Sequence, residues 1–556
     1  MLPAEPSSIA RSVRRFGDEY PIVISQWPIR GAGLILVVAT IFYIPWMFAS
    51  LNGAAWWAAW PFAAASLFSA VYSLVAVCNL WQRSVPVKRP VQPGAEQAVA
   101  VIIPTCGEPI PMILRTVVSV LEQDYPRDLM TVVVSDDGHD ADLRRELDAL
   151  DLGIIYHEPI DRWAPGRDGA AKAGNLNSAV EMLDARFPDI AYVETRDADD
   201  EVGSIAFARE TIGQLEADQG LGFVQTIKET QVSPGDPFNN RESVFYRGQM
   251  VARNAVNAVF PCGSGLMWRR SALRDIGGFP TWNLVEDLQS GVEALRRGWR
   301  GQYLPIVGAV GQHSPEDVPN VYKQRSTWAI DTVRLMVWGN LRGLNVRQRL
   351  QFYGLALYYL NSFAVMIFLP CLLFSLLGRP PLDASGTSLV MHLVPIIAAT
   401  ELWLLAANHP YNDRRTKQRQ PYLALWRARI IWTGLAPVFA KATILAIING
   451  PNRKPVYKVT RKHNDLRWHA AETVPQMLPL LAVGTVAIYA TVQRTLPSPL
   501  LLLATMYWGA LNVVLLAGFV TRGWHGLERL PFIERRRAKD DSTVSSSADV
   551  SEGERA

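Results

Sequence analysis

Six segments of this chain are long and apolar enough to cross a membrane, and they are separated into two groups by a long charged stretch. Spanning the hydrocarbon core takes about 20 mostly apolar residues. The segments that approach this length are 33–50, 54–81, 352–377, 388–406, 477–492 and 499–520. Their distribution predicts an all-α, multi-span membrane domain that is interrupted between its second and third spans.

The interrupting block, residues 95–345, has the pattern of a water-soluble α/β domain. Apolar runs of strand length at 99–103 and 131–135 alternate with helical stretches. Near the end of the block, apolar residues recur at helical spacing, which predicts an amphipathic helix. They are Ile330, Val333, Val337 and Leu341. Periodicity alone leaves open whether this helix lies on the membrane surface or on the domain core.

Charge and cysteine content exclude several classes of protein. The net charge of +4 is small for 556 residues and gives no reason to expect nucleic-acid binding. Four cysteines stand far apart and form no Cys-x-x-Cys pair, so neither a disulfide framework nor a zinc site is indicated. Lys and Arg crowd the ends of the apolar segments, and the positive-inside rule then places the charged block in the cytoplasm. We therefore expect a multi-pass protein of the cell inner (plasma) membrane.

A seventh apolar segment, 430–449, carries Pro437 and Lys441 near its middle. If it crossed the membrane, the basic residues on its two sides could not all face the cytoplasm, so an interfacial or re-entrant helix is favoured. The expected organisation has four parts. They are a cytosolic arm with two spans (1–94), the cytosolic α/β domain (95–345), a transmembrane channel region (346–525) and a disordered cytosolic tail (526–556).

Polar and acidic residues follow the ends of two predicted strands. Thr105 and Glu108 follow the first strand, and Asp136 and Asp137 follow the second. In open α/β sheets, ligands bind beyond the carboxyl ends of the strands. The alternative for an isolated Asp-Asp-Gly sequence is a turn with a helix cap.

A denser group of acids follows in the same block. Five carboxylates lie within eight residues, and like charges about 4 Å apart repel by roughly 1 kcal/mol even in water. They are Glu194, Asp197, Asp199, Asp200 and Glu201. A divalent cation would relieve the repulsion, and Mg²⁺ held by one or two carboxylates plus substrate phosphates is a common arrangement. We expect Asp197 and Asp199 to bind Mg²⁺ or Mn²⁺, although Asp-x-Asp also occurs by chance in solvated loops.

Two further positions carry groups suited to transfer chemistry. Lys172 supplies a point charge suited to a phosphate, and Asn175 an amide suited to hydroxyls. A helix start with Asn caps is the alternative there. Asp287, next to Glu286, is a carboxylate that could cap the following helix.

The order of these motifs resembles that of the processive family 2 glycosyltransferases, the group of cellulose, chitin and hyaluronan synthases. The closest likeness is to the bacterial cellulose synthase catalytic subunit, over about residues 95 to 475. The motifs are Asp136–Gly138, Lys172–Asn177 (Lys-Ala-Gly-Asn-Leu-Asn), Asp197–Asp199, Glu286–Asp287 and Gln324–Trp328. The resemblance implies a GT-A glycosyltransferase domain with a mixed sheet, inserted in the membrane domain.

The resemblance also implies roles for individual residues. The two strand-end loops would hold the uridine, and Asp287 and Glu286 would be the catalytic residues, with Val285 in place of the family's usual Thr. The nucleotide-sugar site would comprise Thr105, Glu108, Asp136, Asp137, Lys172, Asn175, Asp197, Gln324 and Arg325. The acceptor site would comprise Cys262, Gly263, Ser264 and Trp328. A tight turn is the alternative for the Cys262 segment.

One departure from the family pattern concerns processivity. Gln324 and Trp328 match the ends of the Gln-x-x-Arg-Trp signature, but Thr327 replaces its Arg. Arg325 or Arg334 could compensate in part for the missing charge at the leaving diphosphate.

The segment 453–463 resembles the gating loop of cellulose synthase. The matching residues are Tyr457, Val459, Thr460 and Lys462. A short basic loop near a membrane is the alternative. Inside the spans, Asn361, His392 and Glu401 are polar, so they either line a sugar channel or form interhelical hydrogen bonds.

These patterns predict a membrane-embedded inverting enzyme that polymerises a cellulose-like β-glucan from UDP-glucose and translocates it. Its expected partners are the UDP-sugar, the growing polysaccharide chain, the lipid bilayer and an accessory export subunit, with no nucleic acid. Synthesis of another β-linked polymer, or transfer to a lipid acceptor without processivity, remains open because of Thr327. A transporter or receptor without transfer activity would not need the base Asp287.

Overall fold

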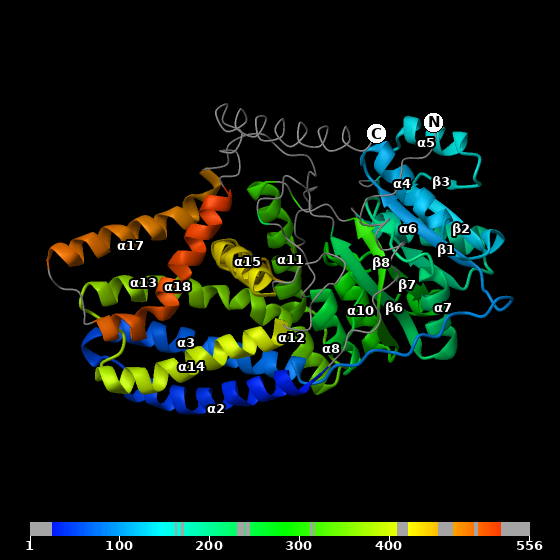
Figure 1. The fold of residues 1–556 in the computed structure, drawn as a ribbon. Coiled ribbons are helices and arrows are strands. Elements are labelled where there is room, and N and C mark those ends of the chain that lie inside the picture. The colour runs from blue at the N-terminus through cyan, green and yellow to red at the C-terminus, as the bar shows by residue number, and fades with distance from the viewer. Residues whose placement is uncertain are drawn as a thin grey trace, which may run out of the picture.

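The computed structural model has two parts, a mixed α/β domain and a group of long helices beside it (Figure 1). It describes residues 25–161, 164–167, 169, 172–230, 238, 245–311, 315, 317–408, 421–453, 471–493 and 499–523. The predicted gating residues Tyr457, Val459, Thr460 and Lys462 lie outside the described residues.

The α/β domain is built on one eight-stranded sheet with the order β3-β2-β1-β4-β7-β6-β8-β5. Its strands are β1 (Val99–Thr105), β2 (Met130–Asp136), β3 (Ile155–His157), β4 (Tyr192–Thr195), β5 (Glu201–Val202), β6 (Leu221–Thr230), β7 (Leu266–Arg269) and β8 (Arg300–Gly311). Strands β3, β2, β1 and β4 are parallel, and β7 is antiparallel to both of its neighbours. The sheet is therefore mixed, as predicted for a GT-A domain.

Helices cover both faces of this sheet. The domain helices are α4 (Ile110–Leu121), α5 (Ala141–Ala149), α6 (Lys172–Arg186), α7 (Phe207–Ala217), α8 (Met250–Asn254), α9 (Arg270–Asp275) and α10 (Glu286–Arg296). Successive side chains of a strand point to opposite faces, so Val99 and Val101 of β1 join one core while Ala100 and Ile102 join the other. Because both faces are packed, the strands read as continuous apolar runs.

The helical part contains all six predicted apolar segments as helices. They lie within α2 (Trp27–Ala49), α3 (Trp56–Leu80), α12 (Val346–Leu360) with α13 (Ser362–Leu376), α14 (Gly386–Asn408), α17 (Val474–Val492) and α18 (Pro499–Gly523). In the described part of the chain, five helical segments are long and apolar enough to cross a membrane, or six if one bent pair is a single span. Large apolar side chains of α2, such as Leu34, Val38 and Phe42, are exposed, as expected for a surface that faces lipid.

The bent pair corrects the single helix expected over 430–449. The chain forms α15 (Pro421–Gly434) and α16 (Ala436–Asn449) in its place, with a bend of 55° between them. Pro437 lies in the first turn of α16. A proline has no N–H and its ring clashes with the carbonyl four residues earlier, so it favours a kink or a break at this point. The pair is geometrically a broken span or a re-entrant loop.

Two segments join the α/β domain to the helices. Helix α11 (Val318–Trp338), the predicted amphipathic helix, packs against α16 and α12, between the sheet and the helical part (Figure 1). The linker after α3 runs along the domain, where Val91 donates its N–H to the carbonyl of Arg209 in α7. A Cβ atom on Gly213 of α7 would lie only 1.8 Å from the carbonyl oxygen of Arg89, so the linker lies directly on this helix.

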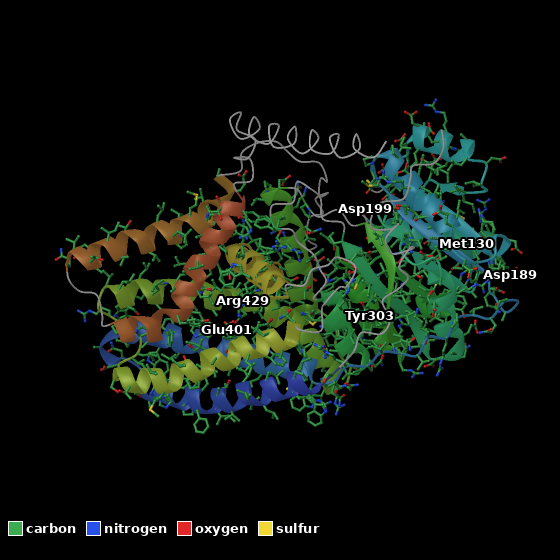
Figure 2. The ribbon with its side chains drawn as sticks, in the orientation of Figure 1. Met130, Asp189, Asp199, Tyr303, Glu401 and Arg429 are labelled. Carbon is green, nitrogen blue, oxygen red and sulfur yellow. The ribbon has the colours of Figure 1, made fainter. Side chains whose placement is uncertain are left out.

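The polar residues predicted inside the spans form contacts between helices or within one. Asn361 accepts a hydrogen bond from Ser69 of α3, and Glu401 of α14 accepts from Arg429 of α15 at 2.8 Å. His392 bonds the Ser388 carbonyl in its own helix and stacks on Trp46. The interhelical hydrogen bonds expected as one of two alternatives are therefore present at Asn361 and Glu401. Figure 2 labels Glu401 and Arg429 among the helices.

Candidate active site

The carboxyl ends of the parallel strands gather the predicted donor residues at the edge of the sheet that faces the helical part. Asp199 lies on this side of the domain, whereas Met130 and Asp189, which stand at the beginnings of strands, lie on the far side (Figure 2). Thr105 and Asp136 are paired in register at the ends of β1 and β2. A ligand site at these strand ends, as expected from the sequence, is compatible with this geometry.

Asp136 is held firmly by the protein. Its Oδ1 accepts from Thr105 Oγ1 at 3.0 Å and from Gly138 N at 2.8 Å. Its Oδ2 accepts from Asp140 N at 2.8 Å and from Tyr156 OH at 2.9 Å. The residue is 1% exposed, so this carboxylate fixes the shape of the strand-end turn.

The neighbouring loop is closed by a buried ion pair. Arg167 Nη2 donates to both oxygens of Asp137, at 2.7 and 2.9 Å, and both side chains are less than 5% exposed. Glu108 accepts from the backbone N–H of Cys106 at 2.6 Å. Asn175, which is 2% exposed, donates to the carbonyls of Ser135 and Thr105 and so ties α6 to the ends of β1 and β2.

Asp197 is the electrostatic centre of the site, because a lysine contacts each of its oxygens. Lys172 donates to Oδ1, and Lys228 Nζ lies 2.7 Å from Oδ2. Burial opposes ionisation of Asp197, but the two ammonium groups overcome it and hold its pKa well below the usual range. The Asp197 side chain is 25% exposed, so it remains open to a ligand.

Asp197 and Asp199, the predicted metal ligands, supply only part of the ligand set that a divalent cation needs. Among the residues that the structure describes, no three His, Cys, Asp or Glu side chains are grouped closely enough to complete a metal site. Asp197 and Asp199 are 25% exposed (side chain) and 9% exposed (residue), respectively, and their oxygens are the ligands that Mg²⁺ and Mn²⁺ prefer. The donor set thus fits a metal that takes its remaining ligands from a substrate and water.

Asp287 stands in the first turn of α10, where the helix dipole favours a negative charge. Its Oδ1 accepts from Leu288 N at 2.6 Å. Burial, and then the charge of Glu286, raise the pKa of Asp287 to about 7. A carboxyl group with this pKa is suited to accept a proton near neutral pH.

Gly263 brings the candidate base, the lysine and the acid together. Its φ of +80° is a conformation that favours glycine, and its carbonyl accepts from Lys172 Nζ at 3.1 Å. A Cβ atom here would lie 3.0 Å from Lys172 Nζ and 3.3 Å from Asp287 Oδ2. The absence of a side chain therefore keeps space open between these two groups.

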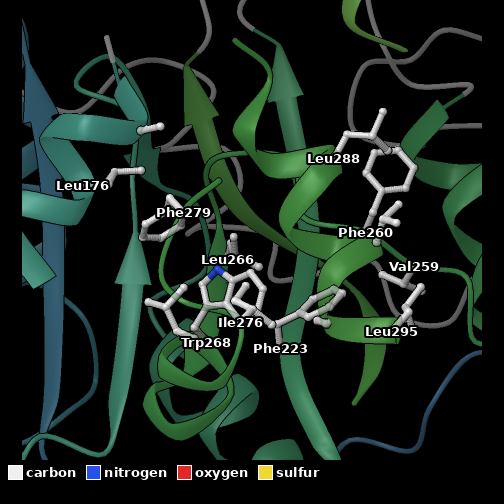
Figure 3. Packing of buried hydrophobic residues seen from close by; sticks show 14 of the residues in the cluster. Leu176, Phe223, Val259, Phe260, Leu266, Trp268, Ile276, Phe279, Leu288 and Leu295 are labelled. Carbon is white, nitrogen blue, oxygen red and sulfur yellow. The ribbon is translucent and has the colours of Figure 1, made fainter. Parts of the chain in front are cut away.

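The rest of the Cys262–Ser264 segment is fixed by polar contacts and packing. Cys262 N donates to Gln225 Oε1 at 2.7 Å, and Ser264 Oγ accepts from Asp197 N at 3.1 Å. Burial raises the pKa of the Cys262 thiol, so it is not a thiolate nucleophile at neutral pH. Phe260 packs beside Leu288, the residue that follows Asp287 (Figure 3).

Helix α11 carries the predicted signature residues. Trp328 is half-buried, and the Arg325 guanidinium lies 4.6 Å from the centroid of its ring. Gln324 precedes them on the same helix. The Thr327 hydroxyl donates a hydrogen bond of 2.9 Å to the carbonyl of Lys323 in its own helix.

The side chain of Arg334 is hydrogen-bonded to backbone carbonyls of two other segments. It donates to the carbonyls of Trp282 and Pro451 at 2.6 and 2.7 Å. Its side chain therefore does not supply the charge that Thr327 lacks. One turn before it, Asp331 accepts from the backbone N–H groups of Leu284 and Val285, which lead directly to Glu286 and Asp287.

Sequence reasoning did not identify Lys228, Asp331 or the role of Arg334 as parts of this site. Lys228 and its neighbour Glu229 are the two charged residues of strand β6, and Asp331 was interpreted as part of the polar face of an amphipathic helix. A signal was present for Lys228, because a lysine in a strand buried on both faces requires a partner. The partner itself could be found only from the sheet order.

Comparisons with known proteins show which family the charged block is similar to. Residues 95–330 match the model of the family described as glycosyltransferase like family 2. A putative cellulose synthase 2 of Komagataeibacter xylinus is 27% identical over 457 residues, which are 77% of this chain and 28% of that protein. The UDP-forming cellulose synthase catalytic subunit of Pseudomonas fluorescens is 27% identical over 405 residues, 68% of this chain and 52% of that protein.

The comparison with solved structures gives a partial alignment. The mannosyltransferase of Pyrobaculum calidifontis, in complex with GDP-mannose and Mn²⁺, aligns with a TM-score of 0.48 and 22% identity. The alignment covers 70% of this chain and 99% of that one. The resemblance predicted from the motifs is confirmed by these matches: residues 95–330 match the glycosyltransferase family 2 model, and the chain is similar to bacterial cellulose synthase catalytic subunits.

Proposed function

We propose that this protein is a membrane-embedded inverting glycosyltransferase that transfers glucose from UDP-glucose to the end of a growing β-glucan. The observation that carries the proposal is the meeting of Lys172, Asp197 and Asp287 around Gly263, at the edge of the sheet that faces the helical part. The relatives named above include a UDP-forming cellulose synthase subunit, which supports a UDP-sugar as the donor.

The donor would lie across the ends of β1, β2 and β4. Thr105, Glu108, Asp136 and Asp137 stand at the two loops proposed to hold the uridine, with Arg167 and Tyr156 fixing the carboxylates. Lys172 would contact the diphosphate, since it is the basic residue that reaches the edge of the site with part of its side chain exposed. Asn175 would act by holding the strand ends in position.

Asp197 and Asp199 would bind Mg²⁺ or Mn²⁺ together with the diphosphate. When bound, the metal would neutralise the negative charge of the leaving UDP. Gln324 and Arg325 on α11 would close the nucleotide-sugar site from the side of the helices.

Asp287 would be the general base. Its Oδ2 would take the proton from the acceptor hydroxyl as that oxygen forms a bond to the anomeric carbon, while the bond to the UDP oxygen breaks. A single displacement of this kind inverts the anomeric configuration. Glu286 supports the role because its charge raises the pKa of Asp287 toward neutrality.

The acceptor would lie between the Cys262–Ser264 segment and Trp328. An acceptor hydroxyl that lies against Gly263 would be beside Asp287, and a half-buried indole ring can stack on a sugar. Behind this site, the apolar helices would hold the domain at the cytoplasmic face of the inner membrane and carry the polymer across. Tyr457, Val459, Thr460 and Lys462 would serve as a gating loop, and an accessory subunit would continue export.

A second candidate is a synthase of another β-linked polymer, chitin-, hyaluronan-, mannan- or β-1,3-glucan-like, or a non-processive enzyme with a lipid acceptor. Thr327 is the observation that favours it. The Thr327 hydroxyl is bonded within its own helix, and Arg334 is fixed to Trp282, so neither residue supplies the missing charge.

Product analysis of the purified protein tests the proposal. The full chain in lipid vesicles is given Mg²⁺ and one radiolabelled UDP-sugar at a time, with D287N as the control. Insoluble polymer from UDP-glucose that a β-1,4-glucanase digests, and that D287N does not make, supports a cellulose-like synthase. Short or lipid-linked product supports the second candidate, and transfer from no sugar contradicts the enzymatic function.

A further inference from the structure

Lys228 has no role in the function proposed above, although it is one of the most deeply buried lysines that the structure describes. Its side chain is 3% exposed. It projects from β6 so that Nζ lies 2.7 Å from Asp197 Oδ2 and 3.1 Å from Asp200 Oδ2. A buried ammonium group is costly unless it is paired, so these contacts hold Lys228 against the very carboxylate that would bind the metal.

A metal and Lys228 cannot use Asp197 Oδ2 at the same time. Two unit charges of the same sign about 4 Å apart repel by roughly 4 kcal/mol at the effective dielectric near a protein surface, and a divalent cation repels a lysine more. The other oxygen offers no alternative, because Lys172 occupies Oδ1. Without a nucleotide, Asp197 is therefore already neutralised by the chain itself.

The diphosphate changes this balance. It would bring negative charge to the same place, and an ammonium group that leaves a carboxylate can remain paired by contacting a phosphate oxygen. Asp200, which is 1% exposed, would keep its contact with Lys228 during the exchange. The lysine needs only to turn from one anion to another, without passing through an unpaired state.

We propose that Lys228 is a donor-binding residue that blocks the metal site until the nucleoside diphosphate arrives, and then moves from Asp197 to the diphosphate. Metal binding and nucleotide binding are consequently coupled. The free enzyme binds a divalent cation weakly, and the nucleotide opens Asp197 Oδ2 by drawing Lys228 away. This inference rests on the proposed function, because it takes the Asp197 site to be the diphosphate site.

The experiment measures binding rather than turnover. The full-length protein in lipid nanodiscs is titrated with Mn²⁺ alone, followed by electron paramagnetic resonance, and then with Mn²⁺ in the presence of UDP. In the wild type we expect UDP to raise the affinity for Mn²⁺ by roughly tenfold or more, in the range of typical coupling between sites. In K228M, Mn²⁺ alone binds at least about tenfold more tightly than in the wild type, and UDP raises the Mn²⁺ affinity by a smaller factor than in the wild type, because only the ligands from its diphosphate are then added.

Two further variants separate competition from a structural role. K228R keeps a charge on β6 and should behave like the wild type in both titrations. K88M removes a more exposed lysine, 32% exposed, from an ion pair with Glu210, 3.5 Å away, and should change neither affinity. Thermal unfolding of each variant in nanodiscs checks that the domain remains folded.

The outcomes distinguish this inference from the function on which it rests. If K228M binds Mn²⁺ alone no better than the wild type, or less well, the blocking role is wrong, while Mn²⁺-dependent binding of UDP would leave the proposed function intact. If the folded wild type binds neither UDP nor Mn²⁺ under any condition, the proposed function itself is contradicted. If K228M is unfolded, the wild-type titrations still test the coupling between metal and nucleotide. A wild-type affinity for Mn²⁺ that does not change when UDP is added contradicts this coupling.

Discussion

The guanidinium of Arg334 lies 3.9 Å from the centroid of the Trp282 ring and donates to the Trp282 carbonyl. Arg334 and the Trp282 indole both donate to the carbonyl of Pro451, at 2.7 and 2.9 Å. Three distant segments thus meet here: α11, the approach to Asp287 and the end of α16. The last of these leads into the predicted gating loop.

Replacement of Arg334 by lysine should disturb the position of Asp287. Lysine keeps the charge but lacks the planar fork that donates to several carbonyls at once. A displacement of about 1 Å near a reacting group can cost up to a hundredfold in rate, so kcat should fall by roughly ten- to a hundredfold. UDP affinity, measured by calorimetry, should stay close to that of the wild type.

The control for this variant is R342K, a substitution at an exposed arginine just beyond α11. It should leave both kcat and UDP affinity unchanged. An equal loss of activity in R342K, or a loss of UDP affinity in R334K, would show that the contact with Trp282 does not act through the acceptor base.

The pH dependence of transfer should report Asp287. Its pKa is raised to about 7 by burial and by Glu286, and the base must be ionised to accept a proton. Consequently kcat/KM should rise with pH through about 7 and level off above it. The same raised pKa means that the folded state holds this proton more tightly than the unfolded chain, so stability from this group is present at low pH and is lost as pH rises through about 7.

Two substitutions should shift the pH at which kcat/KM rises, which is called the rising limb below, in opposite directions. E286Q removes a negative charge that raises the pKa of Asp287, so its limb should shift to lower pH. K172M removes a positive charge that lowers it, so its limb should shift to higher pH. Initial rates over a pH series measure both, and shifts of the same sign in the two variants would exclude Asp287 as the group observed.

Gly291 of α10 should be intolerant of alanine. A Cβ atom there would lie 2.7 Å from both Phe260 Cβ and Pro261 Cδ, closer than packed atoms approach. Overpacking of this kind costs typically 1–3 kcal/mol. G291A should therefore lower the unfolding temperature, and it should lower kcat because Phe260 and Pro261 position the segment that contains Gly263.

Gly484 of α17 supplies the matched control. It is also inside a helix, and a Cβ atom there would meet nothing within 4 Å. G484A should be neutral or stabilising by up to about 1 kcal/mol, because alanine favours the helix. Equal effects of the two substitutions would show that close packing at Gly291 is unimportant.

The ion pair between Glu401 and Arg429 should stabilise the helical part. Both oxygens of Glu401 accept from Arg429 Nη2, and Tyr507 also donates to Glu401. E401M alone leaves the arginine without its acceptor among apolar helices, so it should lower the unfolding temperature more than the double variant E401M/R429M does. Thermal unfolding in nanodiscs measures this, and additive effects of the two substitutions would mean that the pair is not coupled.

The sequence was sufficient to predict the elements whose physical causes are local. A strand buried on both faces must be continuously apolar, and a span must be long and apolar, so β1, β2 and the six apolar helices were recognisable. The polar residues at strand ends were predictable for the same reason, since parallel strands bring their carboxyl ends to one edge. The two lysines that contact Asp197 were not predictable as its neighbours. Lys172 precedes β4 by 20 residues and Lys228 lies on β6, so only the tertiary fold brings them to Asp197.

The remaining differences also come from tertiary contacts. Arg334 was one of two candidates to replace the missing arginine, but the carbonyls of residues 282 and 451 bind it, and nothing local in the sequence indicates such partners. The break at Leu435 could have been placed from Pro437, which stands inside the apolar segment. Whether α15 and α16 form one broken span depends on the surrounding helices and cannot be read from hydropathy.

The strand order has a consequence for how this protein is made. Strand β7 lies between β4 and β6, so β4 has no partner on that side until residue 269 has been synthesised, and β5 pairs with β8, which ends at residue 311. At translation rates of roughly 5 to 20 residues per second, the unpaired edge of β4 waits several seconds or more for its neighbour. During this interval the backbone N–H and C=O groups on that edge of β4 have no partner strand, so they are open to pairing with another chain.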